Sequence, residues 1–242
     1  MAYSLIIPYY RNPQMLITQL TKINHYPADI EVIIVDDGSP EPALPIIREY
    51  ALRPVSLYRI GVDIPWNRGG ARNLGATQAM HDWIVHIDID HVLMPEHAEK
   101  LLAFVPDKKH WYRFPRWRFG QADETRMKDN VPRDSAFVKI HPHVDSYLCQ
   151  KSDFWKAGGY NEDFSGCLGG GSPFLKELEK IKGAPVMLPD SIFLRVYTRS
   201  SCPDASDNTL SRDKTAFTLR KMKLKGNFKG HRPLRFPWNK EL

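Results

Sequence analysis

The first half of the chain alternates short apolar runs with segments whose apolar residues recur at helical spacing. The runs Ser4 to Ile7 and Glu31 to Val35 have the length of strands, and each stops at a proline or at a polar turn sequence. Between them, the apolar residues from Met15 to Ile23 have the spacing of one helix face. The pattern predicts a strand, helix, strand unit, which implies a right-handed crossover between parallel strands.

The same alternation continues as far as residue 88. Repetition of this kind is typical of a doubly wound sheet with helices on both faces. We therefore expect an α/β protein with a mostly parallel sheet. The further predicted elements are a helix over Ile46–Leu52, a strand over Val55–Ile60, a helix over Gly69–Met80 and a strand over Trp83–Asp88.

The second half of the chain is less regular. From Lys108 to about Val144 the pattern loosens, and aromatic and basic residues interleave between His110 and Phe119. Regular elements are expected again after this segment. They are a helix over Lys151–Ala157, a helix with Ser172 as N-cap, Pro173 in its first turn and Gly183 at its end, and strands over Pro185–Leu188 and Ser191–Tyr197.

One domain should span residues 1–205, with a regular half at about 1–105 and an irregular half at about 106–205. Residues 206–242 read as a basic C-terminal extension, because lysine and arginine are nearly unopposed there. With 42% hydrophobic residues among 242, the chain can bury a sizeable core. The three cysteines are too scattered for a disulfide framework or a zinc site, and we expect free thiols.

Charge and hydropathy limit the environment and the partners. No apolar run approaches the roughly 18 residues that a membrane-spanning helix needs, and the first residues lack the regions of a signal peptide. We expect a cytoplasmic protein, with attachment at the periphery of a membrane as the alternative. The net charge of +6 favours anionic partners such as nucleotide sugars, acidic glycans, membrane surfaces or nucleic acid, but it does not choose among them.

Polar clusters follow the predicted strands at the ends where ligands bind in open α/β sheets. Pro8-Tyr9-Tyr10-Arg11 ends the first strand, Asp36-Asp37-Gly38 ends the second, and Asp88-Ile89-Asp90 follows the strand after the glycine-rich helix. Since the carboxyl ends of parallel strands meet at one edge of the sheet, we expect these side chains to lie together. The coincidence is stronger evidence for a site than any one motif.

The acidic residues at two strand ends have both functional and structural interpretations. In an extended segment Asp88 and Asp90 would point to the same side and offer carboxylates to Mg²⁺ or Mn²⁺. Alternatively, they end the strand and solvate a turn. Asp36 and Asp37 could accept hydrogen bonds from a nucleotide base or a ribose hydroxyl, or else form a plain Asp-Gly turn.

Glycines also mark the start of the third predicted helix. Gly69 and Gly70 are its first two residues, and free backbone N–H groups at a helix N-terminus attract phosphate. Arg72 adds a fork of donors suited to phosphate or a base carbonyl. The segment is neither a Walker loop nor a G-x-G-x-x-G fingerprint. The alternative is a tight turn, with Gly75 allowing close helix packing.

Taken in order, these segments resemble family-2 glycosyltransferases over residues 4 to about 95, and again from Gly158 to Phe164. The resemblance implies a GT-A fold, a nucleotide-diphosphate sugar donor, for which we favour a UDP-sugar, and Mn²⁺ or Mg²⁺. It also implies transfer with inversion, a donor and metal half over residues 1–105, and an acceptor half after it. By position, the resemblance implies that Pro8, Tyr9 and Arg11 line the base pocket and that Asp36 and Asp37 contact the base or the ribose. It implies that Gly69 and Arg72 contact the nucleotide. Asp88 and Asp90 would hold ribose and metal, with Asp90 at the reacting centre.

The sequence departs from this family at the expected catalytic base. Similar enzymes often carry a Glu-Asp pair before a helix, and here Gly171-Ser172 stands in its place. An inverting transfer needs a group to take the acceptor proton. We choose Asp163, with Glu162 and Asp145 as the alternatives. There are two further interpretations. The acceptor needs no base, or the chain is an inactive relative that binds sugar nucleotides or glycans.

A second departure concerns the metal. Similar folds often supply a late histidine, but the region around Arg195 has none. Arg195 or Arg199 could assist the leaving group, or be surface charges. His141, His143 and Asp145 alternate and could share one face near the acceptor, although such alternation is common. We interpret His86 and His91 as packing or turn residues.

We expect a glycan or glycolipid intermediate as acceptor. The alternative is a hydroxyl-bearing base in nucleic acid, contacted by the aromatic segment and the basic tail. A nucleotidyltransferase would need a glycine-rich loop right after the first strand, and Pro8-Tyr9-Tyr10-Arg11-Asn12 contains no glycine.

Overall fold

The computed structural model describes residues 1–64, 66–118, 138–166, 170–197, 214–231 and 233–242. Arg199, together with Phe119, Cys167, Cys202, Arg212 and Arg232, therefore lies outside the described residues. The third cysteine, Cys149, is a buried free thiol, as expected.

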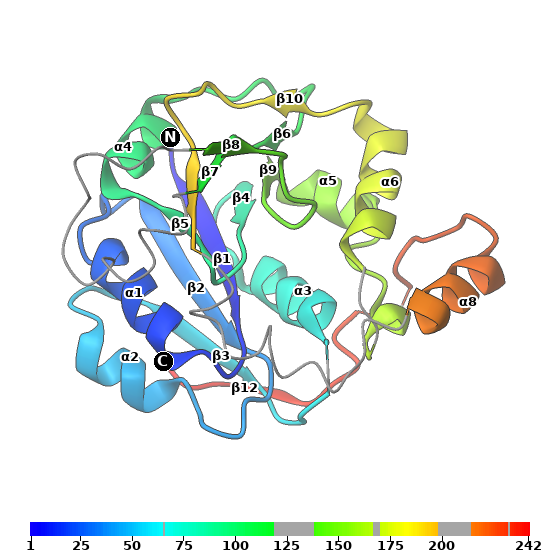
Figure 1. The fold of residues 1–242 in the computed structure, drawn as a ribbon, viewed down its shortest axis with the longest axis horizontal. Helices are drawn as coiled ribbons and strands as arrows, with labels where there is room; N and C mark the ends of the chain where they lie inside the picture. Colours follow the sequence, from blue (N-terminus) through cyan, green and yellow to red (C-terminus); the bar gives the residue numbers. More distant parts are fainter. Residues whose placement is uncertain (65, 119–137, 167–169, 198–213, 232) are drawn as a thin grey trace.

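A large mixed sheet with helices on both faces forms the body of the protein (Figure 1). Its strand order is β10-β6-β9-β4-β1-β2-β3-β12, and the four neighbours β4, β1, β2 and β3 are parallel, as the alternating pattern predicted. The strands of this sheet are β1 Tyr3–Tyr9, β2 Ile30–Asp36, β3 Ser56–Ile60, β4 Trp83–His86, β6 Tyr112–Arg113, β9 Tyr147–Gln150, β10 Val186–Met187 and β12 Trp238–Lys240.

Two apolar layers cover the sheet, because successive side chains of a strand point to opposite faces. On β1, Leu5 and Ile7 join the core beneath α1, α2 and α4, whereas Ile6 joins the core beneath α3, α5 and α6. Gly75 of α3 packs directly on Ile6, which is the structural role that the sequence offered for it. The helices are α1 Pro13–Ile23, α2 Leu44–Tyr50, α3 Arg68–Gln78, α4 Pro95–Ala103, α5 Lys151–Lys156 and α6 Gly171–Lys182, with a 3-10 turn η2 at Glu162–Phe164.

A smaller sheet belongs to the irregular half and completes one side of the strand-end edge. Its order is β5-β11-β7-β8, and only β11 and β7 run parallel. Its first strand follows directly on the Asp88–Asp90 segment, so the two sheets meet at the predicted site. The strands are β5 His91–Leu93, β7 Arg116–Arg118, β8 Val138–Ile140 and β11 Leu194–Val196.

The C-terminal residues contribute to the main sheet, which the sequence did not indicate. Strand β12 pairs antiparallel with the edge strand β3, and Trp238 packs against Tyr58 with ring centroids 6.1 Å apart. Helix α8, Lys214–Leu224, projects from the body and contacts η2 through Phe217 and Phe164 (Figure 1). The described part of the extension is thus folded against the domain.

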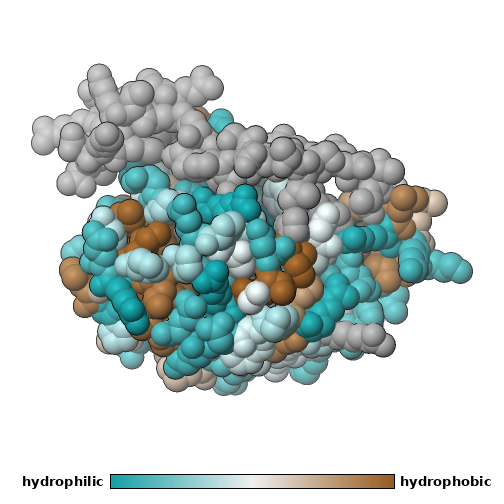
Figure 2. All heavy atoms as spheres, turned by 90° about the horizontal axis from the view of Figure 1, so that it is seen from below, coloured by the Kyte–Doolittle hydropathy of each residue, from teal (hydrophilic) through white to brown (hydrophobic). Residues whose placement is uncertain are grey.

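The surface gives no sign of a membrane-crossing element within the described residues, where no helix is long and apolar enough to span a bilayer. On the face drawn in Figure 2, small apolar areas are separated by hydrophilic residues. Large exposed apolar side chains such as Leu52, Met80 and Val105 lie apart in sequence, in the segments that follow α2, α3 and α4.

Candidate active site

The Asp88–Asp90 segment is a tight turn rather than an extended strand end. The amide of His91 donates to the carbonyl of Asp88 at 3.0 Å, which closes the turn. Gln19 of α1 supports it, because its Nε2 donates to the carbonyls of Ile89 and His91 at 3.0 and 2.9 Å. The turn, and not the two-residue repeat of a strand, therefore decides where the two carboxylates lie.

The Asp88 carboxylate is surrounded by basic side chains. Its Oδ1 pairs with the Arg72 guanidinium and lies 3.9 Å from Nη1 of Arg68, and its Oδ2 lies 3.0 Å from Nδ1 of His143. Burial raises the pKa of this carboxyl, but Arg72, His143 and Arg68 outweigh burial and hold the pKa well below its usual range. Asp88 is therefore a fixed negative charge at neutral pH.

Asp90 has the opposite electrostatic character. Burial and then the charge of Asp88 raise the pKa of Asp90 to about 6. A divalent cation would offset the repulsion between the two carboxylates. Carboxylate oxygens are the ligands that Mg²⁺ and Mn²⁺ prefer. The pair Asp88 and Asp90 thus fits the predicted metal chemistry.

A second donor set includes histidine. One ligand atom each of Asp88, His91 and His143 lies within 4.8 Å of the others, a spacing that could hold a metal ion. Both ring nitrogens of His91 already have partners, since Nδ1 lies 2.8 Å from the Ser146 hydroxyl and Nε2 lies 2.9 Å from Nη1 of Arg116. Burial lowers the pKa of His91 to about 3, so the ring is neutral. These contacts leave neither nitrogen of His91 without a partner, so a metal ion at this cluster would have to displace one of them.

Asp36 and Asp37 end β2 but have different surroundings. Both oxygens of Asp36 accept backbone N–H groups, from Ser39 at 2.8 Å and Ala43 at 3.0 Å, so this carboxylate stabilises the turn after the strand. Asp37 faces α3 and accepts a hydrogen bond from Nδ2 of Asn67 at 3.0 Å. Burial raises the pKa of Asp37 well above its usual range. Of the two, Asp37 is the carboxylate at the start of α3.

At the end of β1, too, neighbouring residues have different surroundings. Pro8 and Tyr9 are buried, and the Tyr9 ring belongs to the core beneath α1. Arg11 lies at the surface, where its Nη2 pairs with Oδ2 of Asp63 at 3.1 Å. Arg11 and Trp66 both have left-handed backbone, with φ of 50° and 54°. Strained residues of this kind often gather at functional sites, and these two lie on loops at the strand-end edge.

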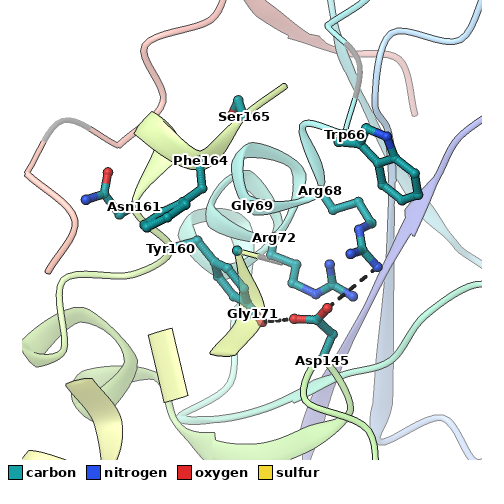
Figure 3. Close-up of a pocket in the computed structure, with 11 residues that line it drawn as sticks. Trp66, Arg68, Gly69, Arg72, Asp145, Tyr160, Asn161, Phe164, Ser165 and Gly171 are labelled. Carbon is teal, nitrogen blue, oxygen red and sulfur yellow. Dashed lines mark hydrogen bonds and ion pairs between the residues drawn. The ribbon is translucent and has the colours of Figure 1, made fainter. Parts of the chain in front are cut away.

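A pocket opens beside the first turn of α3 (Figure 3). Its walls include Trp66, Arg68, Gly69 and Tyr160. A Cβ on Gly69 would lie 3.1 Å from the Cβ of Tyr160, so glycine lets the helix start approach this ring closely. The buried guanidinium of Arg72 lies over the same ring, 5.6 Å from its centroid. The helix N-terminus and the two arginines give the pocket a positive potential that suits phosphate.

Asp145 enters the pocket from the segment before β9. The Tyr160 hydroxyl donates to Oδ1 of Asp145 at 3.0 Å, and Nη1 of Arg68 lies 3.6 Å from its Oδ2. Because Arg68 also lies near Asp88, one guanidinium connects the two carboxylates. The alternation of His141, His143 and Asp145 was the sequence signal for this segment, and the structure brings two of these three side chains to the site.

The two other candidate bases lie elsewhere. The Asp163 side chain is 39% exposed, and its Oδ1 pairs with Nη1 of Arg235 at 2.8 Å. Glu162 is buried and accepts hydrogen bonds from Nδ2 of Asn73 and the amide of Leu234, both at 2.8 Å, which ties the C-terminal segment to α3. Among the described residues that line the pocket beside α3, neither carboxylate appears.

Three aromatic residues of the aromatic and basic segment belong to the core, whereas Trp117 is partly buried and Arg118 is exposed. Trp111 and Phe114 are fully buried, and Tyr112 is 4% exposed. Arg113 donates to the carbonyl of Pro142 at 2.7 Å. Arg195 is also buried rather than a surface charge, and its guanidinium carbon lies 5.2 Å from the centroid of the Tyr197 ring.

Two residues of the pocket, and Asn67 next to it in the chain, received little weight from the sequence. Arg68 stands directly before the two glycines of α3, and Tyr160 follows the pair Gly158-Gly159. Asn67 bridges two parts of the site, because it donates to Asp37 and accepts from the Ser165 hydroxyl at 2.6 Å. The glycine pairs marked the right segments, but the partners of these side chains come from distant parts of the chain.

Comparison with known sequences identifies related proteins. The model of glycosyl transferase family 2 matches residues 4–167. The validoxylamine A glucosyltransferase of Streptomyces hygroscopicus subsp. limoneus is 25% identical over 201 residues, which cover 67% of this chain and 44% of that protein. The hyaluronan synthase of Pasteurella multocida is 37% identical over 91 residues, covering 36% of this chain and 9% of the synthase. The chain thus spans less than half the length of either relative.

Solved structures give the same picture of the fold. S. aureus TarS 1–349 in complex with UDP aligns with 93% of this chain and 72% of its own, with a TM-score of 0.61 and 16% identity. The mannosyltransferase PcManGT from Pyrobaculum calidifontis, in complex with GDP-Man and Mn²⁺, aligns with 80% of this chain and 56% of its own, with a TM-score of 0.57 and 14% identity. The fold is the expected GT-A arrangement. Because the family match extends over residues 4–167, more than half of the chain, this protein belongs to glycosyl transferase family 2.

Proposed function

We propose that this protein transfers a sugar from a nucleotide-diphosphate sugar to an acceptor hydroxyl, with inversion and with a divalent cation. The observation that carries the proposal is the meeting of Asp88 with Arg68, Arg72 and the start of α3 beyond the ends of parallel strands, with Asp90 close enough for the charge of Asp88 to raise its pKa. Ligands bind at this edge in open α/β sheets. Family membership agrees with this assignment.

We assign Mn²⁺ or Mg²⁺ to Asp90, with Asp88 beside it and near the ribose. The bound ion would neutralise charge on the departing diphosphate. Arg72 holds Asp88 in place from the buried side, so this carboxylate is oriented before a ligand arrives. The neighbour PcManGT was solved with Mn²⁺, which supports the choice of ion.

We assign the diphosphate to Arg68 and the N-terminus of α3 at Gly69. The Arg68 side chain is 31% exposed and borders the pocket, whereas the Arg72 side chain is 1% exposed and already bound to Asp88. Arg68 is therefore the better placed of the two for direct contact with phosphate, and Arg72 acts through Asp88. Asp37 and Arg11 remain our candidates for the ribose and the base.

The donor we propose is a UDP-sugar, because solved neighbours are complexes with UDP and UDP-GlcNAc. A glycan or glycolipid is the proposed acceptor, met in the cytoplasm or at a membrane surface. Trp111 and Phe114 are buried and so cannot stack on the bases of a nucleic acid, which weakens the alternative of a nucleic-acid acceptor.

The test is a panel of nucleotide sugars incubated with Mn²⁺ or Mg²⁺, with release of nucleoside diphosphate as the readout. We expect one donor to be turned over, and Asp90→Ala or a chelator to lower the rate at least about a hundredfold, since metal assistance contributes several kcal/mol and each 1.36 kcal/mol is tenfold. The matched control is Asp190→Ala, which removes a carboxylate that is 65% exposed and paired with Lys139 on the surface. Failure of every donor to react or to shift the melting temperature would reject the proposed function.

A further inference from the structure

The place of the missing Glu-Asp pair is filled in space by another carboxylate. Gly171 is the first residue of α6, and a Cβ added there would lie 2.1 Å from Oδ1 and 2.7 Å from Cγ of Asp145. Atoms cannot approach so closely, so no side chain fits at position 171 while Asp145 holds its position. The loss of the pair at 171–172 and the presence of Asp145 are therefore one structural feature.

The surroundings of Asp145 point its carboxylate toward the pocket. Figure 3 shows it between the Tyr160 hydroxyl and the Arg68 guanidinium, facing the interior, and the Tyr160 contact occupies Oδ1. Oδ2 is the oxygen that faces Arg68, the residue we assign to the diphosphate. An inverting transfer needs the acceptor hydroxyl on the face of the sugar opposite the leaving diphosphate, so Oδ2 would receive the proton with the sugar lying between that hydroxyl and the phosphate held by Arg68.

Resting on the proposed function, we infer that Asp145 is the catalytic base of the transfer, supplied from the segment before β9 in place of a carboxylate on α6. The acceptor hydroxyl oxygen forms a bond to the anomeric carbon as the bond from that carbon to the β-phosphate oxygen breaks. The bonding electron pair leaves with the diphosphate, and the hydroxyl proton passes to Oδ2 of Asp145. Tyr160 positions the carboxylate through Oδ1.

The other two carboxylates fit this role less well. Asp163 pairs with Arg235 and lies outside the pocket lining. Glu162 already accepts hydrogen bonds from Asn73 and from backbone amides of the C-terminal segment. Asp145 is the carboxylate that both lines the pocket and contacts the helix where the family carries its base.

The first experiment replaces Asp145 by asparagine, which has the same shape and still accepts from Tyr160. Release of nucleoside diphosphate is followed from the donor that the panel identifies, with water and with para-nitrophenyl glycosides as acceptors. We expect a loss of about 10²–10⁴-fold in kcat, with the affinity for UDP or GDP and the melting temperature close to wild type. Asp163→Asn is the competing variant, and loss there with full activity in Asp145→Asn would overturn the assignment.

A second pair of variants moves the carboxylate without changing its chemistry. Gly171→Ala places a Cβ against Asp145, and we expect it to lower kcat at least about tenfold, since small misplacements of a catalytic group have large effects. Gly170→Ala is the matched control, because among the described residues its Cβ would meet only the Cβ of Phe164, at 3.4 Å. Equal rates in the two alanine variants would contradict the proposed geometry.

Rescue separates a base from a structural carboxylate. In an Asp145→Ala background, Ser172→Asp restores a carboxylate at the position where the family carries it, and we expect at least about tenfold recovery of kcat, as a base again lies near the acceptor. No recovery, together with weaker nucleotide binding in Asp145→Asn, would show a structural role and overturn the inference. If the wild-type chain binds no nucleotide sugar, the proposed function fails and the inference falls with it. Full turnover in Asp145→Asn rejects only the inference.

Discussion

We propose a donor side and an acceptor side for the site, and the two are built in different ways. On the donor side, Asp37 and the Asp88–Asp90 turn follow β2 and β4, which flank β1 in the parallel part of the sheet. On the acceptor side, Asp145, Tyr160 and Gly171 come from separate segments that meet around one arginine-lined pocket. Strand pairing alone brings the first group together, whereas the second group depends on side-chain packing between elements.

This difference teaches where the site tolerates change. The donor side takes its geometry from buried strands that pair side by side, so its residues are positioned by the backbone of the sheet. The acceptor side has no such frame, and a carboxylate there can be supplied from a different segment if a glycine makes room. Substitutions that separate these two modes of construction test the comparison directly.

The largest change in stability should come from replacing Arg72, which contacts residues on both the donor side and the acceptor side. Arg72→Met removes the buried partner of Asp88 and the cation over the Tyr160 ring. We expect a loss of about 3 kcal/mol in the free energy of unfolding, because the remaining buried carboxylate is left short of its partner. Urea denaturation measures it.

The control for this prediction is the double variant Arg72→Met/Asp88→Asn. Neutralising the stranded carboxylate should recover part of the stability, since neighbouring residues in one ion pair are not additive. A double variant no more stable than Arg72→Met alone would mean that Arg72 stabilises by packing and not by pairing.

An intermediate effect is expected where the donor side relies on close packing. In Gly75→Ala the new Cβ would lie 2.4 Å from Cγ2 of Ile6. Overpacking should outweigh the better helix propensity of alanine and cost about 1–2 kcal/mol. Gly61→Ala is the matched control, because among the described residues the atom nearest its Cβ would be the Pro237 carbonyl oxygen, at an ordinary 3.5 Å. Equal melting temperatures would show that the α3 contact with β1 is looser than described.

The smallest expected change in stability comes from replacing a buried polar side chain of the core. His86 stacks on Phe154 with ring centroids 5.3 Å apart, and among the described residues neither of its ring nitrogens has a hydrogen-bond partner. Burial lowers the pKa of His86 well below its usual range, so the ring is neutral. His86→Phe should stabilise the fold by about 1 kcal/mol, because the cost of unpaired buried polar groups exceeds that of a slightly larger ring.

His91→Phe makes the matching comparison, since His91 has partners at both ring nitrogens. We expect it to destabilise, because Ser146 and Arg116 would each lose a partner. Thermal unfolding of both variants provides the measurement. A loss of stability in His86→Phe would imply that its ring nitrogens are satisfied by water.

The sequence by itself determined the parallel core and the strand-end motifs. Apolar runs and helical spacing are local signals, so the elements from Tyr3 to His86 were predicted with boundaries shifted by only a few residues. Helical crossovers keep the successive strands parallel, so their carboxyl ends lie at one edge of the sheet. The location of Asp37, Asp88 and Asp90 at that edge follows from this rule. The family resemblance rested on the same segments.

Only the tertiary structure decided what each polar side chain does. Asp36 and Asp37 are adjacent in sequence, yet one binds its own turn and the other faces α3. Whether a carboxylate is exposed, paired or beside a helix start depends on residues far away along the chain, as with Asp163 and Arg235 or Asp145 and Gly171. Such contacts have no local period in the sequence, because side-chain packing, and not backbone repetition, brings them together.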